Sequence, residues 1–142
     1  MLKVVHSDDA PEAIGPYSQA ILVEPGRAYL FMSGQIGLKP DGSGEMIDGG
    51  INGQTLMILS NASSVWKAAG ARKEDVVSAT IFLYDLDDFV EVNRIYGEYF
   101  GQHKPARTTV EVSALPKGAL IEISFIVAIP APPSLEGNSA VA

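Results

Sequence analysis

Two charged residues in otherwise apolar or alternating stretches have side chains suited to chemistry on a small acid. Arg107 lies in the alternating stretch 106–112, and its planar guanidinium can bind a carboxylate through two parallel hydrogen bonds, which a lysine cannot do. Glu122 lies within an apolar run, where an unpaired carboxylate is costly, so it needs a partner or a function such as general acid/base catalysis or the positioning of water. An ion pair from Arg107 to Glu111 or Glu122 is the alternative, and spacing alone favours it.

Three further residues could contact a substrate, and each also has an ordinary structural explanation. Tyr17 follows a Gly-Pro pair in a turn-rich stretch, so its hydroxyl could donate a hydrogen bond, or its ring could simply pack the loop. Gly34 lies in the stretch Ser33-Gly34-Gln35, a turn that can present a backbone N–H to an anion, although many such turns bind nothing. Asn93 lies on a predicted helix and could simply hydrogen-bond a nearby loop.

The chain has no cysteine and only two histidines, which excludes several kinds of site. A disulfide framework, a thiolate nucleophile and any metal site built on sulfur are ruled out. His6 and His103 lie near the ends of predicted elements and look like surface residues, so we expect no metal site. No Ser-His-Asp motif, dinucleotide fingerprint or phosphate-binding loop is present.

Composition limits the class of protein. The 142 residues suit one domain, and 46% hydrophobic with 19% charged residues is a globular composition. A net charge of −7 produces a field that opposes nucleic-acid binding. No stretch reaches the roughly 18 to 20 apolar residues of a membrane helix, and no signal-peptide core is present, so we expect a cytoplasmic protein.

The elements that must position these residues follow from hydrophobic spacing. Residues 51–69 have the spacing of an amphipathic helix and are followed by Gly70, a typical C-terminal cap. A second helix ends near Phe100, and Asp88 with Glu91 resembles a capping box at its start.

Alternating and β-branched stretches predict the strands, which are 3–6, 18–23, 28–33, 76–84, 106–112 and 120–129. The turn Pro25-Gly26 predicts a hairpin between the second and third of these, and the glycine-rich residues 34–50 predict a long surface loop. We therefore expect a single α+β domain over residues 1–130 and a disordered tail over residues 131–142.

The number of helices predicts an uncovered sheet face. Two amphipathic helices can cover one face of a sheet of about five or six strands, so the other face must meet water or another subunit. We expect this second face to mix apolar residues with Arg107, Thr109 and Glu122, and therefore to form a subunit contact that contains a polar pocket. A solvated sheet face is the alternative.

Several short segments, taken together, resemble the RidA/YjgF/YER057c family, also called the reactive intermediate deaminases. Each segment is weak alone, but the set occurs in the family's order across residues 8–129. The segments are 10–20 (APEAIGPYSQA), 33–36 (SGQI), 68–70 (AAG), 85–89 (DLDDF), 92–93 (VN), 105–108 (PART), 115–119 (LPKGA) and 121–123 (IEI).

The resemblance implies a chorismate-mutase-like α+β fold, with a mixed β-sheet and two helices packed on one face. It also implies a homotrimer with its sheets turned inward and with active sites at the subunit interfaces. The implied activity is the hydrolysis of reactive 2-imino and enamine acids to 2-keto acids and ammonia, without a cofactor.

The resemblance also implies roles for individual residues. Arg107 would bind the substrate carboxylate with help from the backbone at Gly34, and Glu122 would position or activate water. Tyr17 and Asn93 would lie at or near the pocket. Thr109 would be the third catalytic position: many members have cysteine there, but the assigned role belongs largely to the backbone carbonyl, so threonine need not abolish activity, and the subfamily stays open.

Two other functions fit the same resemblance. Some members are described as endoribonucleases or translation inhibitors, but the acidic balance of this chain weighs against nucleic acid. A non-catalytic, small-carboxylate-binding or chaperone-like trimer would use the same clefts. Glu122 separates binding from catalysis, because a binding protein needs Arg107 but no carboxylate that activates water.

Overall fold

The computed structural model describes residues 2–130. The predicted disordered tail over residues 131–142 lies outside these residues. The strands and α-helices are β1 (Leu2–Val5), β2 (Ala20–Val23), β3 (Arg27–Phe31), α1 (Gly50–Ala68), β4 (Val76–Leu83), α2 (Phe89–Phe100), β5 (Ala106–Glu111) and β6 (Ile121–Pro130). Both predicted helices are therefore present within a residue or two of their expected bounds.

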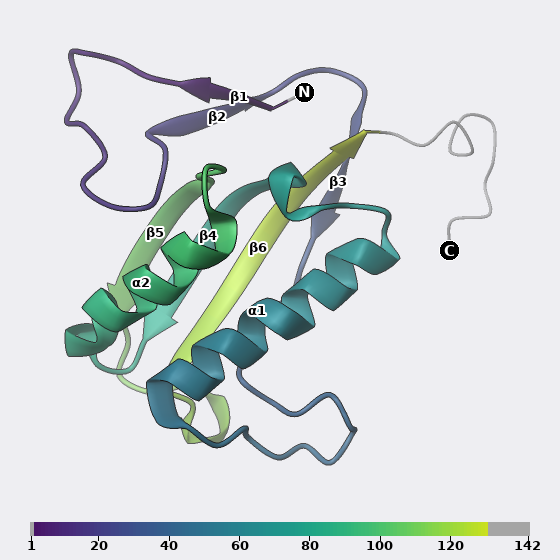
Figure 1. The fold of residues 1–142 in the computed structure, drawn as a ribbon, viewed down its shortest axis with the longest axis vertical. Helices are drawn as coiled ribbons and strands as arrows, with labels where there is room; N and C mark the ends of the chain where they lie inside the picture. The colour runs from purple at the N-terminus through teal and green to yellow at the C-terminus, as the bar shows by residue number, and fades with distance from the viewer. Residues whose placement is uncertain (1, 131–142) are drawn as a thin grey trace.

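One mixed sheet forms the centre of the fold. Its strand order is β3-β6-β4-β5, and β1 pairs with β2 in a separate two-stranded sheet. Strands β4 and β5 are parallel, whereas β6 is antiparallel to both β3 and β4. Helices α1 and α2 lie side by side across one face of the larger sheet (Figure 1). The predicted α+β class, with two helices on one face of a mixed sheet, is confirmed.

Alternate residues of the central strands form the core under the helices. In β6, Ile121, Ile123 and Val127 are fully buried and Phe125 is almost so, as the period of two predicts. Trp66 from α1 is also fully buried and meets the Phe125 ring edge-on, with the ring centroids 5.4 Å apart. The core fixes which side of each strand faces the helices.

Two local predictions were wrong. Residues 18–33 do not form a hairpin, because β2 pairs with β1 and β3 pairs with β6. The turn chemistry predicted a reversal, but the long apolar β6 offers β3 a larger pairing partner. The capping box also fails, because the Asp88 side chain makes no capping bond; instead the Asp85 side chain accepts from the Asp87 N–H one turn earlier.

The sheet face opposite the helices carries exposed apolar side chains. Phe31 is 75% exposed, and Tyr29 and Val110 are also exposed. The Tyr29 and Phe31 rings lie 6.2 Å apart on the edge strand β3. A surface of this kind is typical of a site that another protein surface covers.

Candidate active site

An open pocket of about 550 Å³ lies at the edge of the sheet, between α2 and the loop before β2. It brings together four of the six predicted site residues: Tyr17, Asn93, Arg107 and Thr109. The other lining residues are mainly apolar, and they are Ile14, Gly15, Leu86, Asp87, Phe89 and Val90. The pocket therefore combines a cation and polar groups with an apolar wall.

Arg107 is the only cationic side chain that lines this pocket in the described chain, and aromatic rings surround it. Its guanidinium carbon lies 5.1 Å from the Tyr96 ring centroid and 5.5 Å from those of Tyr17 and Phe89, within the range of cation–π attraction. Burial lowers the pKa of Arg107 from its ordinary value. Among residues 2–130, no carboxylate forms an ion pair with it, and its buried Nη1 has no hydrogen-bond partner. The guanidinium is thus partly desolvated, and the described chain offers it no anion.

Other buried polar atoms nearby also lack a partner. Asn93 Oδ1 and Thr109 Oγ1 line the same pocket and make no hydrogen bond within the described chain. The Tyr96 hydroxyl is buried and unpartnered beside them, and burial raises its pKa well above the ordinary tyrosine value, so it stays protonated. Buried polar groups in folded proteins are normally satisfied, so this concentration of exceptions indicates a polar ligand.

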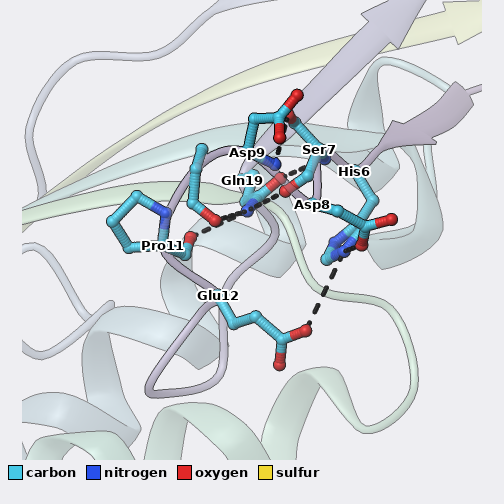
Figure 2. A network of polar contacts seen from close by, with 8 residues as sticks. His6, Ser7, Asp8, Asp9, Pro11, Glu12 and Gln19 are labelled. Atoms are coloured by element: carbon cyan, nitrogen blue, oxygen red, sulfur yellow. Dashed lines mark hydrogen bonds and ion pairs between the residues drawn. The ribbon is translucent and has the colours of Figure 1, made fainter.

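A network around Gln19 shapes the loop that carries Tyr17. The Gln19 Nε2 donates to the carbonyl oxygens of Pro11 at 2.7 Å and Ser7 at 3.2 Å, and its Oε1 accepts from the Ser7 N–H at 2.6 Å. Figure 2 shows Gln19 at the centre of this loop, with His6 bonded to Asp8 at its margin. One side chain thereby holds both ends of a turn-rich segment together.

The same loop is attached to the start of β5. The Ser18 N–H donates to the Pro105 carbonyl at 3.2 Å, and the Ser18 hydroxyl donates to the Lys104 carbonyl. These contacts place Tyr17 beside Arg107, because Tyr17 directly precedes Ser18 and Arg107 lies two residues after Pro105. The Tyr17 hydroxyl accepts from the Ile14 N–H at 3.2 Å.

Acidic residues lie at one side of the pocket. Asp87 lines it, and Asp85 and Asp88 are its neighbours in the chain. Burial, with added repulsion from the other two aspartates, raises the pKa of Asp88. This side of the pocket therefore repels a polyanion.

Glu122 and Arg107 lie on opposite faces of the sheet, which corrects the prediction that they share the uncovered face. Arg107 pairs through β4 with the position of buried Phe125, so Arg107 and Thr109 are on the helix side. Glu122 pairs with Phe82 and lies on the open side. The error arose because a period of two orders residues within a strand but leaves the register between strands undetermined.

Gly34 lies beside Glu122 rather than in the pocket. An ideal Cβ at Gly34 would overlap Glu122 Oε2 and would lie 2.9 Å from Glu122 Cδ. Within residues 2–130, the Glu122 carboxylate makes no hydrogen bond or ion pair. The predicted alternative of an Arg107 ion pair with Glu111 or Glu122 is therefore wrong, and Glu111 instead accepts from the Leu86 N–H at 2.8 Å.

Sequence reasoning missed Phe89 and Tyr96 as parts of the site. Both lie on α2, where an apolar spacing alone points to the core rather than to a pocket. The available signal was that this helix links β4 to β5, the strand that carries Arg107. Its inward face must therefore pass over Arg107 as well as over the core.

The described residues contain neither a metal-binding cluster nor a membrane-spanning helix. Residues 2–130 contain no group of three or more histidine, cysteine, aspartate or glutamate residues that could hold a metal ion. Over the same residues, neither helix has the length and apolar character needed to cross a membrane.

Comparison with known proteins identifies the family. A family model described as Endoribonuclease L-PSP matches residues 7–129. The 2-iminobutanoate/2-iminopropanoate deaminase of Homo sapiens is 45% identical over 124 residues, which cover 87% of this chain and 88% of that protein. A RutC family protein of Pyrococcus horikoshii is 47% identical over 126 residues, covering 89% of this chain and 97% of that protein. A solved structure of the conserved Rid protein family from Yersinia pestis has a TM-score of 0.69 and 45% identity, and the match covers 91% of this chain and 100% of that one. The chain therefore belongs to the RidA/YjgF family.

Proposed function

We propose that this protein hydrolyses reactive 2-imino and enamine acids to 2-keto acids and ammonia. The observation that carries the proposal is the partly desolvated guanidinium of Arg107, which has no carboxylate partner in the described chain and shares its pocket with unpartnered Asn93 and Thr109 atoms. A substrate carboxylate supplies the missing anion, and the apolar wall accommodates the substrate side chain. The name of the human relative supports this substrate class.

The chemistry asks little of the protein beyond orientation and proton transfer. Water adds to the electrophilic carbon of the C=N bond, and one proton moves from that water to nitrogen. The hydroxyl proton of the resulting carbinolamine then moves to the nitrogen as the C–N bond breaks, so ammonia leaves and the C=O bond forms. Arg107 would hold the carboxylate so that this carbon faces the water, and Glu122 would carry the proton.

Because the two groups lie on opposite faces of one sheet, this mechanism needs two copies of the chain. We infer a homotrimer in which Arg107, Asn93, Thr109 and Tyr17 of one subunit meet Gly34 and Glu122 of its neighbour. The exposed apolar residues of the open face, including Phe31 and Tyr29, support a contact between copies. Each interface would then complete one active site.

The other two candidate functions differ in what they require. The family model is described as an endoribonuclease, but RNA would bring phosphates toward the acidic side of the pocket at Asp87 in a chain of net charge −7. A carboxylate-binding protein would need Arg107 and its pocket but would not need Glu122.

A coupled assay tests the proposal. An amino-acid oxidase with catalase supplies a 2-imino acid, and keto-acid formation is followed with and without this protein. We expect the protein to accelerate keto-acid release beyond spontaneous hydrolysis, and the Arg107→Lys variant to lose most of this effect. Binding of 2-oxobutanoate without any acceleration would identify a binding protein, whereas cleavage of RNA alone would support the endoribonuclease.

A further inference from the structure

We propose that Gly34 is a positioning residue whose missing side chain forms the seat of the Glu122 carboxylate. This inference goes beyond a role for the Gly34 backbone in binding the substrate, and its kinetic part rests on the proposed function. In this inference, close packing of the Glu122 side chain against Gly34 sets the conformation of Glu122, because no hydrogen bond from the described chain holds its carboxylate.

The backbone around Gly34 holds the two residues together. The Met32 N–H donates to the Phe125 carbonyl at 3.1 Å, and Gln35 exchanges hydrogen bonds with Ile123 at 2.8 and 3.0 Å. Gly34 lies between these anchors, alongside the strand that carries Glu122. The Gly34 Cα therefore has a fixed position relative to the start of the Glu122 side chain.

Glu122 is the nearest neighbour of the space where a Gly34 side chain would lie. The three atoms nearest to an ideal Gly34 Cβ are Oε2, Cδ and Cγ of Glu122, with Cδ at 2.9 Å and Cγ at 3.1 Å. A distance below 3.0 Å is closer than real Cβ atoms approach other groups, so an alanine here forces a movement. The movable atoms are the end of a flexible side chain, so Glu122 moves and the backbone stays.

Backbone conformation does not require glycine at this position. Eight glycines of residues 2–130 have a positive φ, and Gly34 is not one of them. Alanine at position 34 can therefore keep the same backbone and the same N–H. This separates Gly34 from Gly37, where an added Cβ would meet the backbone Cα of Gln54 at 2.9 Å.

Gly34→Ala is thus a specific displacement of Glu122. Because misplacing a catalytic group by about 1 Å can cost on the order of 10²-fold in rate, we expect kcat to fall by about that factor, with KM within about threefold of wild type. The Glu122→Gln change should lower kcat by roughly 10²-fold or more. Adding Gly34→Ala to Glu122→Gln should then cost less than about threefold more.

The double variant distinguishes the proposal from a role of Gly34 in leaving room for the substrate. If an added methyl group merely obstructs the substrate, KM rises and the loss persists in the Glu122→Gln background, which would overturn the inference. Full activity of Gly34→Ala would overturn it as well. The shortened Glu122→Asp side chain leaves room for the methyl group, so adding Gly34→Ala to Glu122→Asp should cost less than adding it to wild type.

An NMR measurement tests the position of the Glu122 carboxylate without relying on enzyme activity. With ¹³C-labelled glutamate, the Glu122 Cδ resonance should move in Gly34→Ala while the other glutamate resonances and the thermal midpoint stay in place. An unmoved Glu122 resonance would refute the steric seat even in an active enzyme. If the Glu122 resonance moves in Gly34→Ala but the wild-type protein has no deaminase activity, the steric seat is supported and the proposed function is rejected.

Discussion

Replacing Arg107 by lysine tests the central contact of the proposed site. Lysine keeps the positive charge but can offer a carboxylate only one directed hydrogen bond at a time, whereas the guanidinium offers two. It also lacks the flat surface that faces the rings of Tyr17, Phe89 and Tyr96 at 5.1 to 5.5 Å. The variant therefore separates charge from geometry.

The magnitude follows from these two losses. A hydrogen bond to a charged group contributes about 1.5 to 3 kcal/mol, and a partly desolvated cation–π contact contributes about 0.5 to 1 kcal/mol. Together they suggest a loss of about 2 to 4 kcal/mol in the binding of the transition state. Because every 1.4 kcal/mol is a factor of ten, kcat/KM should fall by about 30-fold to 1,000-fold.

The coupled keto-acid assay measures this loss, and calorimetric titration with 2-oxobutanoate shows whether ground-state binding falls with it. Arg94→Lys is the matched control, because Arg94 lies on α2 but is 51% exposed and pairs with Glu91 and Glu98. We expect kcat/KM of this control to stay within about twofold of wild type. A kcat/KM within threefold of wild type for a folded Arg107→Lys protein would refute the bidentate contact.

Three further predictions concern assembly and stability. In sedimentation equilibrium, the wild-type protein should have about three times the 15.1 kDa mass of one chain. The Phe31→Glu change places a charge on the exposed apolar face and should reduce the measured mass to that of one chain. A mass of 15.1 kDa for the wild type at micromolar concentration would reject the trimer. The Asp75→Ala change breaks a nearly buried ion pair with Arg27 at 3.2 Å, so it should lower the free energy of unfolding, measured in urea titrations, by about 3 to 5 kcal/mol. The control Glu45→Ala, which breaks an exposed pair with Lys39, should cost less than about 1 kcal/mol. Equal losses in the two variants would contradict the argument. The raised pKa of Asp88 means that the folded state binds its proton more tightly than the unfolded state, so this group reduces stability as the pH rises through its titration. Asp88→Asn should therefore match the protonated wild type near pH 3 and exceed wild-type stability at neutral pH, and thermal unfolding across about pH 3 to 7 would show the reverse if the sign is wrong.

The sequence predicted elements better than the contacts between them. Hydrophobic spacing placed the first helix over 51–69, and the structure has it over Gly50–Ala68. The alternation in 120–129 agrees with the buried side of β6, which carries Ile121, Ile123 and Val127. The false hairpin at Pro25-Gly26 shows the limit, because turn residues favour a reversal of the chain without specifying which strand will pair.

The site was predicted in composition but not in arrangement. Arg107, Tyr17, Asn93 and Thr109 do share a pocket. Glu122 does not join them within one chain, because register through β4 puts it on the other face. Pairing register depends on contacts distant in sequence, so a single strand's pattern cannot reveal which residues of two strands face the same side.

The unpaired guanidinium of Arg107 also has an evolutionary consequence. A cation partly removed from water, with no anion from the described chain, lowers the stability of the fold, so an uncharged side chain of similar length, such as methionine, should raise it. Selection for heat resistance alone would therefore replace Arg107 early in a laboratory lineage. Arginine would be retained under such selection only if a ligand occupies the pocket. The fraction of selected variants that keep arginine at position 107 would therefore report whether the pocket binds its ligand in the cell.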